Sequence, residues 1–362
     1  MNTWVEVNLS AIKSNAQAIR QHAQGRQLIA VIKADAYGHG AVRVAQALDA
    51  EAAMYAVATV DEGVALREAG IDKPLLILFS PLPEQAEVVA RYELTPAAHE
   101  PLLCRALSQC AKTLGNAVRV HVAVNTGMNR DGIWHEDAIG FVKWLNGLEG
   151  IEVEGIFTHF ANADDLDVAL QLARFSKLLA ALTDRNLKPP IVHAANSAAT
   201  LMFPETHFDA VRVGLSLYGV YPSRQIASRC AVALQPALVW KARVIWQHRP
   251  VVGEGVSYGH TYRIGEPTQL ATVAIGYADG YPRALSNRGI ALIGGERAQL
   301  AGRVCMDATV FRLAPTAKVA VGDEATLIGK ELPVDDIAET ANTIPYEILT
   351  GIGRRVRRVY VE

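Results

Sequence analysis

The chain has 362 residues, half of them hydrophobic, which is enough for one large domain or two ordinary ones with a sizeable core. Its 35 basic and 37 acidic residues leave a net charge of −2, which does not favour nucleic acid as a partner. No apolar run reaches the roughly 18 residues that a membrane span needs. The polar first ten residues do not resemble a signal peptide, so we expect a cytoplasmic protein without a membrane partner.

Four cysteines occur, and none forms a C-x-x-C pair or stands at metal-ligand spacing from histidines. Their pattern predicts neither a disulfide framework nor a metal site, and it fits a reducing compartment. The basic cluster at 354–358 is interpreted as a solvated or salt-bridged strand end.

Short apolar segments alternate with helical ones from about residue 10 to about residue 230. Strands are expected at 28–33, 54–59, 75–79, 94–97, 118–125, 153–160, 191–195 and 208–213. Helices are expected after Ser10 as far as Gly25, and at 40–48, 61–69 and 166–182. Eight strand–helix units favour a (β/α)8 barrel. A doubly wound open sheet is the alternative, but the turn after the first strand lacks a G-x-G-x-x-G pattern.

Helical periodicity fades after about residue 232, and short strands separated by Gly and Pro take its place. Strands are expected at 238–247, 270–275, 300–305, 309–313 and 324–328, with a short helix at 333–340. We therefore predict an α/β protein with an N-terminal (β/α)8 barrel at 9–232 and a mostly-β domain formed by 1–8 and 233–362. The segment Val5-Glu6-Val7 is expected to pair with that second domain.

Lys33 ends the first predicted strand, in the sequence Val-Ile-Lys-Ala-Asp-Ala-Tyr-Gly-His-Gly. A lysine at the end of an apolar strand is costly to desolvate, and burial lowers its pKa. Such an amine can form a Schiff base with a carbonyl cofactor such as pyridoxal phosphate (PLP). The alternative is a snorkelling lysine with its head in water.

Five predicted strands carry a polar residue at or near their carboxyl ends: Lys33, Asn125, His159, His193 and Arg212. In a parallel barrel the catalytic residues come from these ends. Taken singly, each could be a satisfied buried group, and Asn196 and Ser197 could be helix caps. Their coincidence at one rim favours an active site.

The same rim suits PLP. Ser197 and the backbone around Gly214 follow the seventh and eighth strands, where barrels commonly bind phosphate. Arg212 could donate to the pyridine nitrogen and keep it unprotonated, which makes the cofactor a weaker electron sink. In the second domain, Tyr258 lies between small residues in a predicted turn. Its side chain could project into a cavity, or it could be a core aromatic.

These motifs together resemble the alanine racemases, a family of fold-type III PLP enzymes, over nearly the whole chain. The matching segments are 31–40, 125–130, 193–200, 257–262, 276–280 and 305–307. The resemblance implies that Lys33 holds PLP covalently and serves as one acid–base group, while Tyr258 serves as the other. It also implies a homodimer with shared active sites, in which Tyr258 and Met306 come from the second subunit.

The resemblance assigns further roles to residues of this chain. The phosphate-binding residues would be Tyr37, Ser197, Gly214 and Leu215. Arg212 would face the pyridine nitrogen with His159 supporting it, and Asn196 belongs to the same cofactor site. Arg130 and the backbone at Met306 would hold the substrate carboxylate. The substrate entrance would be lined by Asp164, Tyr277, Arg283 and Arg303.

The chain departs from the family pattern at two positions. Many relatives carry a carbamylated lysine where this chain has Ala123, so Arg130 lacks that anionic partner. We hypothesise that a bound anion such as chloride, or Asn125 with water, replaces it. Some relatives have a tyrosine near the C-terminus where Arg354 stands here, which leaves open how Tyr258 is oriented.

The leading hypothesis is an alanine racemase that supplies D-alanine for peptidoglycan. A racemase of broader specificity, for serine, lysine or other amino acids, is the first alternative, because the two departures alter the surroundings of the pocket. PLP decarboxylases or dehydratases of this fold type would need other signatures. A non-enzymatic PLP-binding protein would resemble the barrel alone and would not need the second domain.

Overall fold

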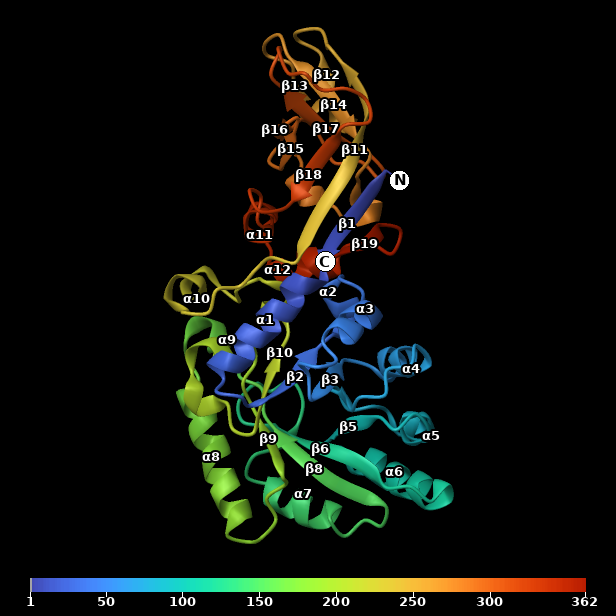
Figure 1. The fold of residues 1–362 in the computed structure, drawn as a ribbon, viewed down its shortest axis with the longest axis vertical. Helices are drawn as coiled ribbons and strands as arrows, with labels where there is room; N and C mark the ends of the chain where they lie inside the picture. Colours follow the sequence, from blue (N-terminus) through green and yellow to red (C-terminus); the bar gives the residue numbers. More distant parts are fainter. Residues whose placement is uncertain (1) are drawn as a thin grey trace. The chain divides into compact units, whose positions relative to one another are not determined.

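The computed structural model describes residues 2–362, and contacts divide the chain into two compact units, each visible in Figure 1. The barrel unit contains residues 11–36 and 41–235. The β unit contains the chain up to Ser10, the segment Tyr37–Gly40 and residues Pro236–Glu362. The β unit is therefore assembled from three stretches that lie far apart in the sequence.

The barrel unit is built on eight parallel strands that close on themselves. They are β2 (Gln27–Val31), β3 (Met54–Val57), β4 (Leu75–Ile77), β5 (Thr95–Ala98), β6 (Val118–Asn125), β8 (Ile151–Phe157), β9 (Ile191–His193) and β10 (Ala210–Val213). Neighbours pair in this order, and β10 pairs back onto β2. The short strand β7 (Ile133–Trp134) also pairs with β6. The predicted (β/α)8 barrel is confirmed, and its strands are largely buried, as in other parallel sheets covered by helices.

Helices alternate with these strands along the chain. They are α1 (Leu9–His22), α2 (Lys33–Tyr37), α3 (Ala41–Ala47), α4 (Val60–Glu68), α5 (Ala86–Arg91), α6 (Pro101–Leu114), α7 (Ala138–Leu145), α8 (Ala169–Thr183), α9 (Ser197–Met202) and α10 (Arg224–Arg229). Single 3₁₀ turns occur at η1 (Pro83–Gln85), η2 (Ala163–Asp165), η3 (Pro204–Thr206) and η4 (Leu215–Tyr218).

Local sequence explains where these helices begin and end. In α6, the Glu100 carboxylate accepts a hydrogen bond from the Leu103 amide at 2.7 Å, and Pro101 occupies the first helical position. Gly115 ends this helix with a φ of +73°. In α4, Thr59 and Glu62 form a capping box.

The β unit contains a second closed sheet, antiparallel in its ring. The ring is β11 (Leu238–His248), β14 (Gln269–Val273), β17 (Thr309–Leu313), β16 (Glu296–Leu300), β15 (Ile290–Ile293) and β18 (Glu324–Ile328), with β18 pairing back onto β11. Strand β1 (Thr3–Asn8) pairs antiparallel with β11 and parallel with β19 (Arg357–Val361). The predicted pairing of Val5-Glu6-Val7 with this domain is therefore confirmed.

Smaller elements complete the β unit. They are the hairpin of β12 (Gly255–Val256) and β13 (Tyr262–Arg263), the helices α11 (Val334–Ala341) and α12 (Pro345–Thr350), and the 3₁₀ turns η5 (Tyr258–His260), η6 (Tyr277–Asp279) and η7 (Arg283–Leu285).

The strand predicted at 300–305 is wrong. The strand in this region, β16, ends at Leu300, and an irregular loop follows. Gly302 has a φ of +86°, and a side chain there would lie 2.6 Å from the carbonyl oxygen of Val256. The chain therefore leaves the sheet at this glycine, which frees the following residues to form a loop.

Candidate active site

Lys33 begins a left-handed turn directly after β2. Residues 34–37 have φ values between 51° and 53°, although none of them is glycine. Each such residue costs roughly 1–2 kcal/mol in a left-handed conformation, so the turn needs support from its surroundings. Glu62 supplies part of it, because its Oε1 accepts a hydrogen bond of 2.6 Å from the Ala34 amide. Glu62, which also forms the capping box of α4 with Thr59, thus supports the turn that carries Lys33.

The amine of Lys33 lies among cationic and aromatic groups. Its Nζ is 5.8 Å from the ring centre of Phe79, and the Arg130 guanidinium is 5.0 Å from the same ring. Burial, followed by the charges of Arg130 and Arg212, lowers the pKa of Lys33. Glu62 acts in the opposite direction. A lowered pKa makes the neutral, nucleophilic amine more accessible.

Arg212 lies buried on β10, with 3% of its surface exposed. One terminal nitrogen is 2.6 Å from Nδ1 of His193. The other is 3.0 Å from Nδ1 of His159 and donates to the carbonyl oxygen of Thr158, also at 3.0 Å. Burial and the charge of Arg212 hold the pKa values of both histidines well below their usual range. Both imidazoles are therefore neutral acceptors for a permanently charged donor.

Ser197 joins the ends of β9 and β10. Its Oγ accepts hydrogen bonds from the Gly214 amide at 3.1 Å and the Ser216 amide at 3.4 Å. Asn196 caps α9 through a bond of 2.9 Å from the Ala199 amide to its Oδ1, which is the capping role considered for it from the sequence. The predicted residues Ser197 and Gly214 are thus in direct contact, and Leu215 follows them, buried at the start of η4.

The loop after β6 carries Arg130. Oδ1 of Asn125 accepts bonds from the Gly127 and Asn129 amides at 3.0 and 3.1 Å, so the Asn125 side chain organises its own turn. The carboxylate of Asp131 lies 3.7 Å from Nε of Arg130.

Ala123, two residues before this turn, is 3% exposed and packs with Ala97 and Phe157. The position where relatives would place a modified lysine is therefore apolar in this chain.

Six predicted residues belong to the β unit rather than to the barrel unit: Tyr37, Tyr258, Tyr277, Arg283, Arg303 and Met306. The turn at Tyr258 begins with Ser257, whose φ is +59° and whose Oγ donates to the Arg303 carbonyl oxygen at 2.8 Å. The Met306 carbonyl oxygen accepts a bond of 3.1 Å from the Ala278 amide. Tyr258 and Met306 are 71% and 53% exposed within the single chain.

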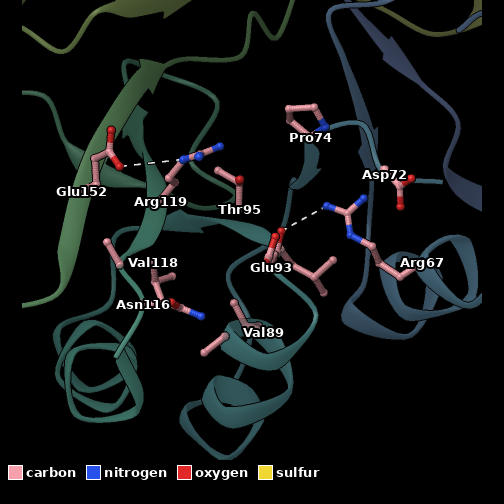
Figure 2. Close-up of a pocket in the computed structure, with 13 residues that line it drawn as sticks. Arg67, Asp72, Pro74, Val89, Glu93, Thr95, Asn116, Val118, Arg119 and Glu152 are labelled. Carbon is pink, nitrogen blue, oxygen red and sulfur yellow. Dashed lines mark hydrogen bonds and ion pairs between the residues drawn. The ribbon is translucent and has the colours of Figure 1, made fainter. Parts of the chain in front are cut away.

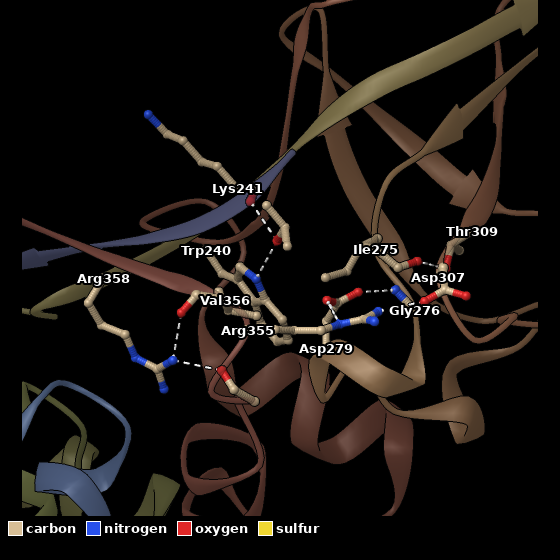
Figure 3. A network of polar contacts seen from close by, with 12 residues as sticks. Trp240, Lys241, Ile275, Gly276, Asp279, Asp307, Thr309, Arg355, Val356 and Arg358 are labelled. Carbon is tan, nitrogen blue, oxygen red and sulfur yellow. Dashed lines mark hydrogen bonds and ion pairs between the residues drawn. The ribbon is translucent and has the colours of Figure 1, made fainter. Parts of the chain in front are cut away.

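A polar network ties these loops to the C-terminal segment of the β unit (Figure 3). Oδ2 of Asp279 accepts from the Gly276 amide at 2.9 Å, and its Oδ1 accepts from Nε of Arg355 at 2.6 Å. Arg355 also donates to Oδ1 of Asp307 at 2.8 Å. The basic cluster near the C-terminus therefore includes a salt-bridged residue, as predicted, and this residue fixes the loops that carry Tyr277 and Met306.

A cavity of about 330 Å³ lies at the other ends of the barrel strands, where β4, β5 and β6 begin (Figure 2). Arg67 in its wall donates to the carbonyl oxygens of Tyr92 at 3.0 Å and Lys73 at 2.8 Å, so it braces two loops. The predicted site residues are absent from the lining of this cavity. The gathered polar groups lie instead at the carboxyl ends, where barrel active sites are found.

The barrel is closed and parallel, and its carboxyl rim brings together a lysine of lowered pKa, two arginines and two neutral histidines. These features define a (β/α)8-barrel enzyme. The alanine racemase N-terminal domain family matches residues 7–222, and the alanine racemase C-terminal domain family matches residues 237–360. This chain belongs to the alanine racemase family and is an isomerase, as the resemblance of its motifs predicted.

Individual relatives agree over the full length. The alanine racemase of Carboxydothermus hydrogenoformans is 45% identical over 366 residues, covering 99% of this chain and 99% of that protein. Alanine racemase 2 of Bacillus subtilis is 40% identical and covers 99% of this chain and 94% of that protein. The structure of alanine racemase from Clostridium difficile matches with a TM-score of 0.95 at 37% identity, covering 100% of this chain and 96% of that chain.

Some residues of the rim were not assigned from the sequence. Phe79 lies beneath both Lys33 and Arg130, and its signal was its place as the last residue of the predicted strand at 75–79. His121 and Glu154 connect to Arg212 through His193. The available signal for them was the imidazole of His121 in the middle of β6, between the apolar residues Val120 and Val122. Across residues 2–362, none of the helices has the length and apolar character to cross a membrane.

Proposed function

We propose that this enzyme interconverts L- and D-alanine, with PLP held covalently on Lys33, and supplies D-alanine for peptidoglycan in the cytoplasm. The observation that carries the proposal is the amine of Lys33, which is flanked by Arg130 and Arg212 at the rim of the barrel. Relatives of 40–45% identity named alanine racemase support it. So do a Bacillus anthracis alanine racemase structure with bound L-Ala-P and a Clostridium difficile one in complex with cycloserine.

The residues at the rim fit PLP. The Ser197 oxygen already accepts from two backbone amides, so its own proton is directed elsewhere and suits a phosphate oxygen. With Tyr37 and the backbone at Gly214 and Leu215, it would form the phosphate site. Arg212, supported by His159, would donate to the pyridine nitrogen. When bound, the cofactor acidifies the Cα proton of the amino acid.

Racemisation needs one group to take the Cα proton from one face and another to deliver a proton to the opposite face. Lys33 is the first group in this proposal and Tyr258 of the partner subunit is the second. Arg130 and the partner's Met306 backbone would hold the substrate carboxylate. Tyr258 is largely exposed on its own chain, which supports a role in another subunit's site. The substrate entrance would be lined by Asp164, Tyr277, Arg283 and Arg303.

A shared site predicts complementation between inactive variants. Lys33→Ala and Tyr258→Phe proteins, each inactive alone, are unfolded and refolded together so that subunits mix at random. Half of the dimers are then mixed and hold one complete site of two, so activity should recover to about one quarter of the wild-type value. Mixing two separately prepared batches of one variant is the control. No recovery in mixed dimers verified by mass would contradict a shared site.

A bound chloride beside Arg130 is the proposed replacement for the modified lysine of relatives. The Asn125 amide is engaged in its own turn, and Ala123 leaves the position apolar. Crystals grown with bromide should show an anomalous peak within contact distance of the Arg130 guanidinium. A well-refined map with no anion there would contradict the proposal and would leave Asp131, at 3.7 Å, as the neighbouring negative charge.

A racemase of broader specificity is the second candidate, favoured by Ala123 and by Arg354, which is exposed in the turn before β19. One assay separates the two candidates. Purified holoenzyme is incubated with L-alanine and with L-serine, L-lysine and other L-amino acids, and each D-product is measured by chiral chromatography. Turnover of alanine well above all others supports the first candidate, and comparable turnover of several amino acids supports the second. No D-alanine from protein that retains its bound cofactor would reject both the alanine assignment and its role in peptidoglycan.

A further inference from the structure

A line of hydrogen-bonded side chains crosses four neighbouring barrel strands and ends at Arg212. Arg212 on β10 is 2.6 Å from Nδ1 of His193 on β9. Nε2 of His193 is 2.8 Å from Nδ1 of His121 on β6. Nε2 of His121 is 3.2 Å from Oε2 of Glu154 on β8. Both histidines are fully buried, so their partners are fixed by the fold.

The direction of every bond in this line follows from its two ends. A guanidinium only donates, so Nδ1 of His193 accepts and its Nε2 carries the proton. That proton is donated to Nδ1 of His121, which leaves the proton of His121 on Nε2. Nε2 then donates to Glu154, whose carboxylate only accepts. One anion and one cation therefore determine the tautomers of both histidines.

Neighbouring residues pack against the two imidazole rings and restrict their positions. Gly155 lies beside His121, and a side chain at this position would come within 2.5 Å of the imidazole. Phe157 stacks on His193 with ring centres 4.9 Å apart and planes inclined by 13°. The hydrogen bond from His121 outweighs burial and lowers the pKa of Glu154, which keeps the carboxylate charged.

We propose that Glu154 and His121 are positioning residues, which keep His193 in place and thereby hold Arg212 in the orientation that the cofactor needs. The role of Arg212 toward the cofactor rests on the proposed function, whereas the histidine tautomers depend only on this chain's own side chains. Glu154 acts on Arg212 through two intervening histidines, because its carboxylate contacts His121 and His121 contacts His193.

The test uses three variants of the full-length holoenzyme. Glu154→Leu removes the acceptor, and Glu154→Gln keeps an acceptor without the charge. Glu152→Gln is the matched control, because Glu152 lies on the same strand, is exposed and contacts Arg119 rather than a histidine. Protein labelled with ¹⁵N-histidine reports which ring nitrogen of each histidine carries a proton. The absorption spectrum of the bound cofactor and kcat and KM for alanine are measured on the same samples.

In the wild type and in Glu154→Gln, His193 and His121 should each show a single tautomer with the proton on Nε2. In Glu154→Leu, Nε2 of His121 loses its acceptor, so His121 should become a mixture of both tautomers. Because His193 and Arg212 are then held less firmly, the cofactor band should shift, and kcat should fall about tenfold with KM changed less than about twofold. A folded Glu154→Leu protein with wild-type tautomers overturns the proposal, as does the same change in Glu152→Gln. If Glu154→Leu does not fold, Glu154→Asp, one methylene short of His121, takes its place with the same readings.

The two proposals fail in distinguishable ways. A protein that racemises no amino acid but shows the predicted tautomers, and loses them in Glu154→Leu, contradicts only the proposed function. If the wild type racemises alanine normally and the histidine tautomers are the same in Glu154→Leu, only the positioning role is contradicted.

Discussion

Lys33→Ala should abolish racemisation, lowering kcat on the order of 10⁴-fold or more, because the variant loses both the covalent attachment of the cofactor and one acid–base group. The charged groups that act on Lys33 are two guanidinium groups and two carboxylates, from Arg130, Arg212, Glu62 and Asp131. None of these groups is an amine, so none can form a Schiff base with the cofactor in its place. Borohydride reduction followed by mass spectrometry of the Lys33 peptide should find cofactor attached in the wild type and none in the variant.

Lys13→Ala is the matched control for this prediction, because Lys13 is exposed on α1. It should retain wild-type activity and cofactor content. A Lys33→Ala protein that still binds cofactor covalently would show that another amine forms the bond, and substantial turnover would remove Lys33 from its proposed role.

Tyr258→Phe should retain the cofactor and lose racemisation by roughly 10²- to 10⁴-fold, the range expected when a positioned acid–base group is removed. The substitution removes only a hydroxyl from a side chain that is 71% exposed on its own chain, so folding should be unaffected. In D₂O, Lys33 should still exchange the Cα proton of one alanine enantiomer, while exchange of the other enantiomer should be lost. Mass spectrometry of each recovered enantiomer measures this asymmetry.

Tyr262→Phe is the control, because Tyr262 lies in β13, four residues along the same hairpin. Its activity should match the wild type. Two-way turnover in Tyr258→Phe at wild-type rate would show that a different residue serves the second face.

The barrel could be predicted because its strands are continuous apolar segments, and β6 begins and ends as the pattern indicated. The hairpin of β15 and β16 was not predicted as two strands. It turns at Gly294 and Gly295, both with positive φ, which is the glycine pattern of a tight hairpin turn. The loop after Leu300 was mistaken for a strand because Ala301, Val304 and Cys305 are apolar. Its course depends on the close approach of Gly302 to Val256.

The candidate site was predicted from chemically distinctive residues at strand ends, but its supports were not. The left-handed turn after Lys33 contains no glycine, so its conformation depends on Glu62, which is distant in the sequence. His121 and Glu154 act through long-range contacts that no local pattern encodes. Phe79 becomes part of the site only because β4 lies near Lys33 in the closed barrel.

The pairing of β1 with both β11 and β19 also constrains how the protein is synthesised. Strand β1 is synthesised long before its partner β19 at Arg357–Val361, so this pairing forms late. The barrel unit, residues 11–36 and 41–235, is complete before then and can fold in the meantime. Throughout that interval β1 presents an unpaired edge, the kind of surface that invites aggregation. Truncation before β19 should therefore trap the chain with this edge exposed, and chaperone dependence should last until β19 has been synthesised.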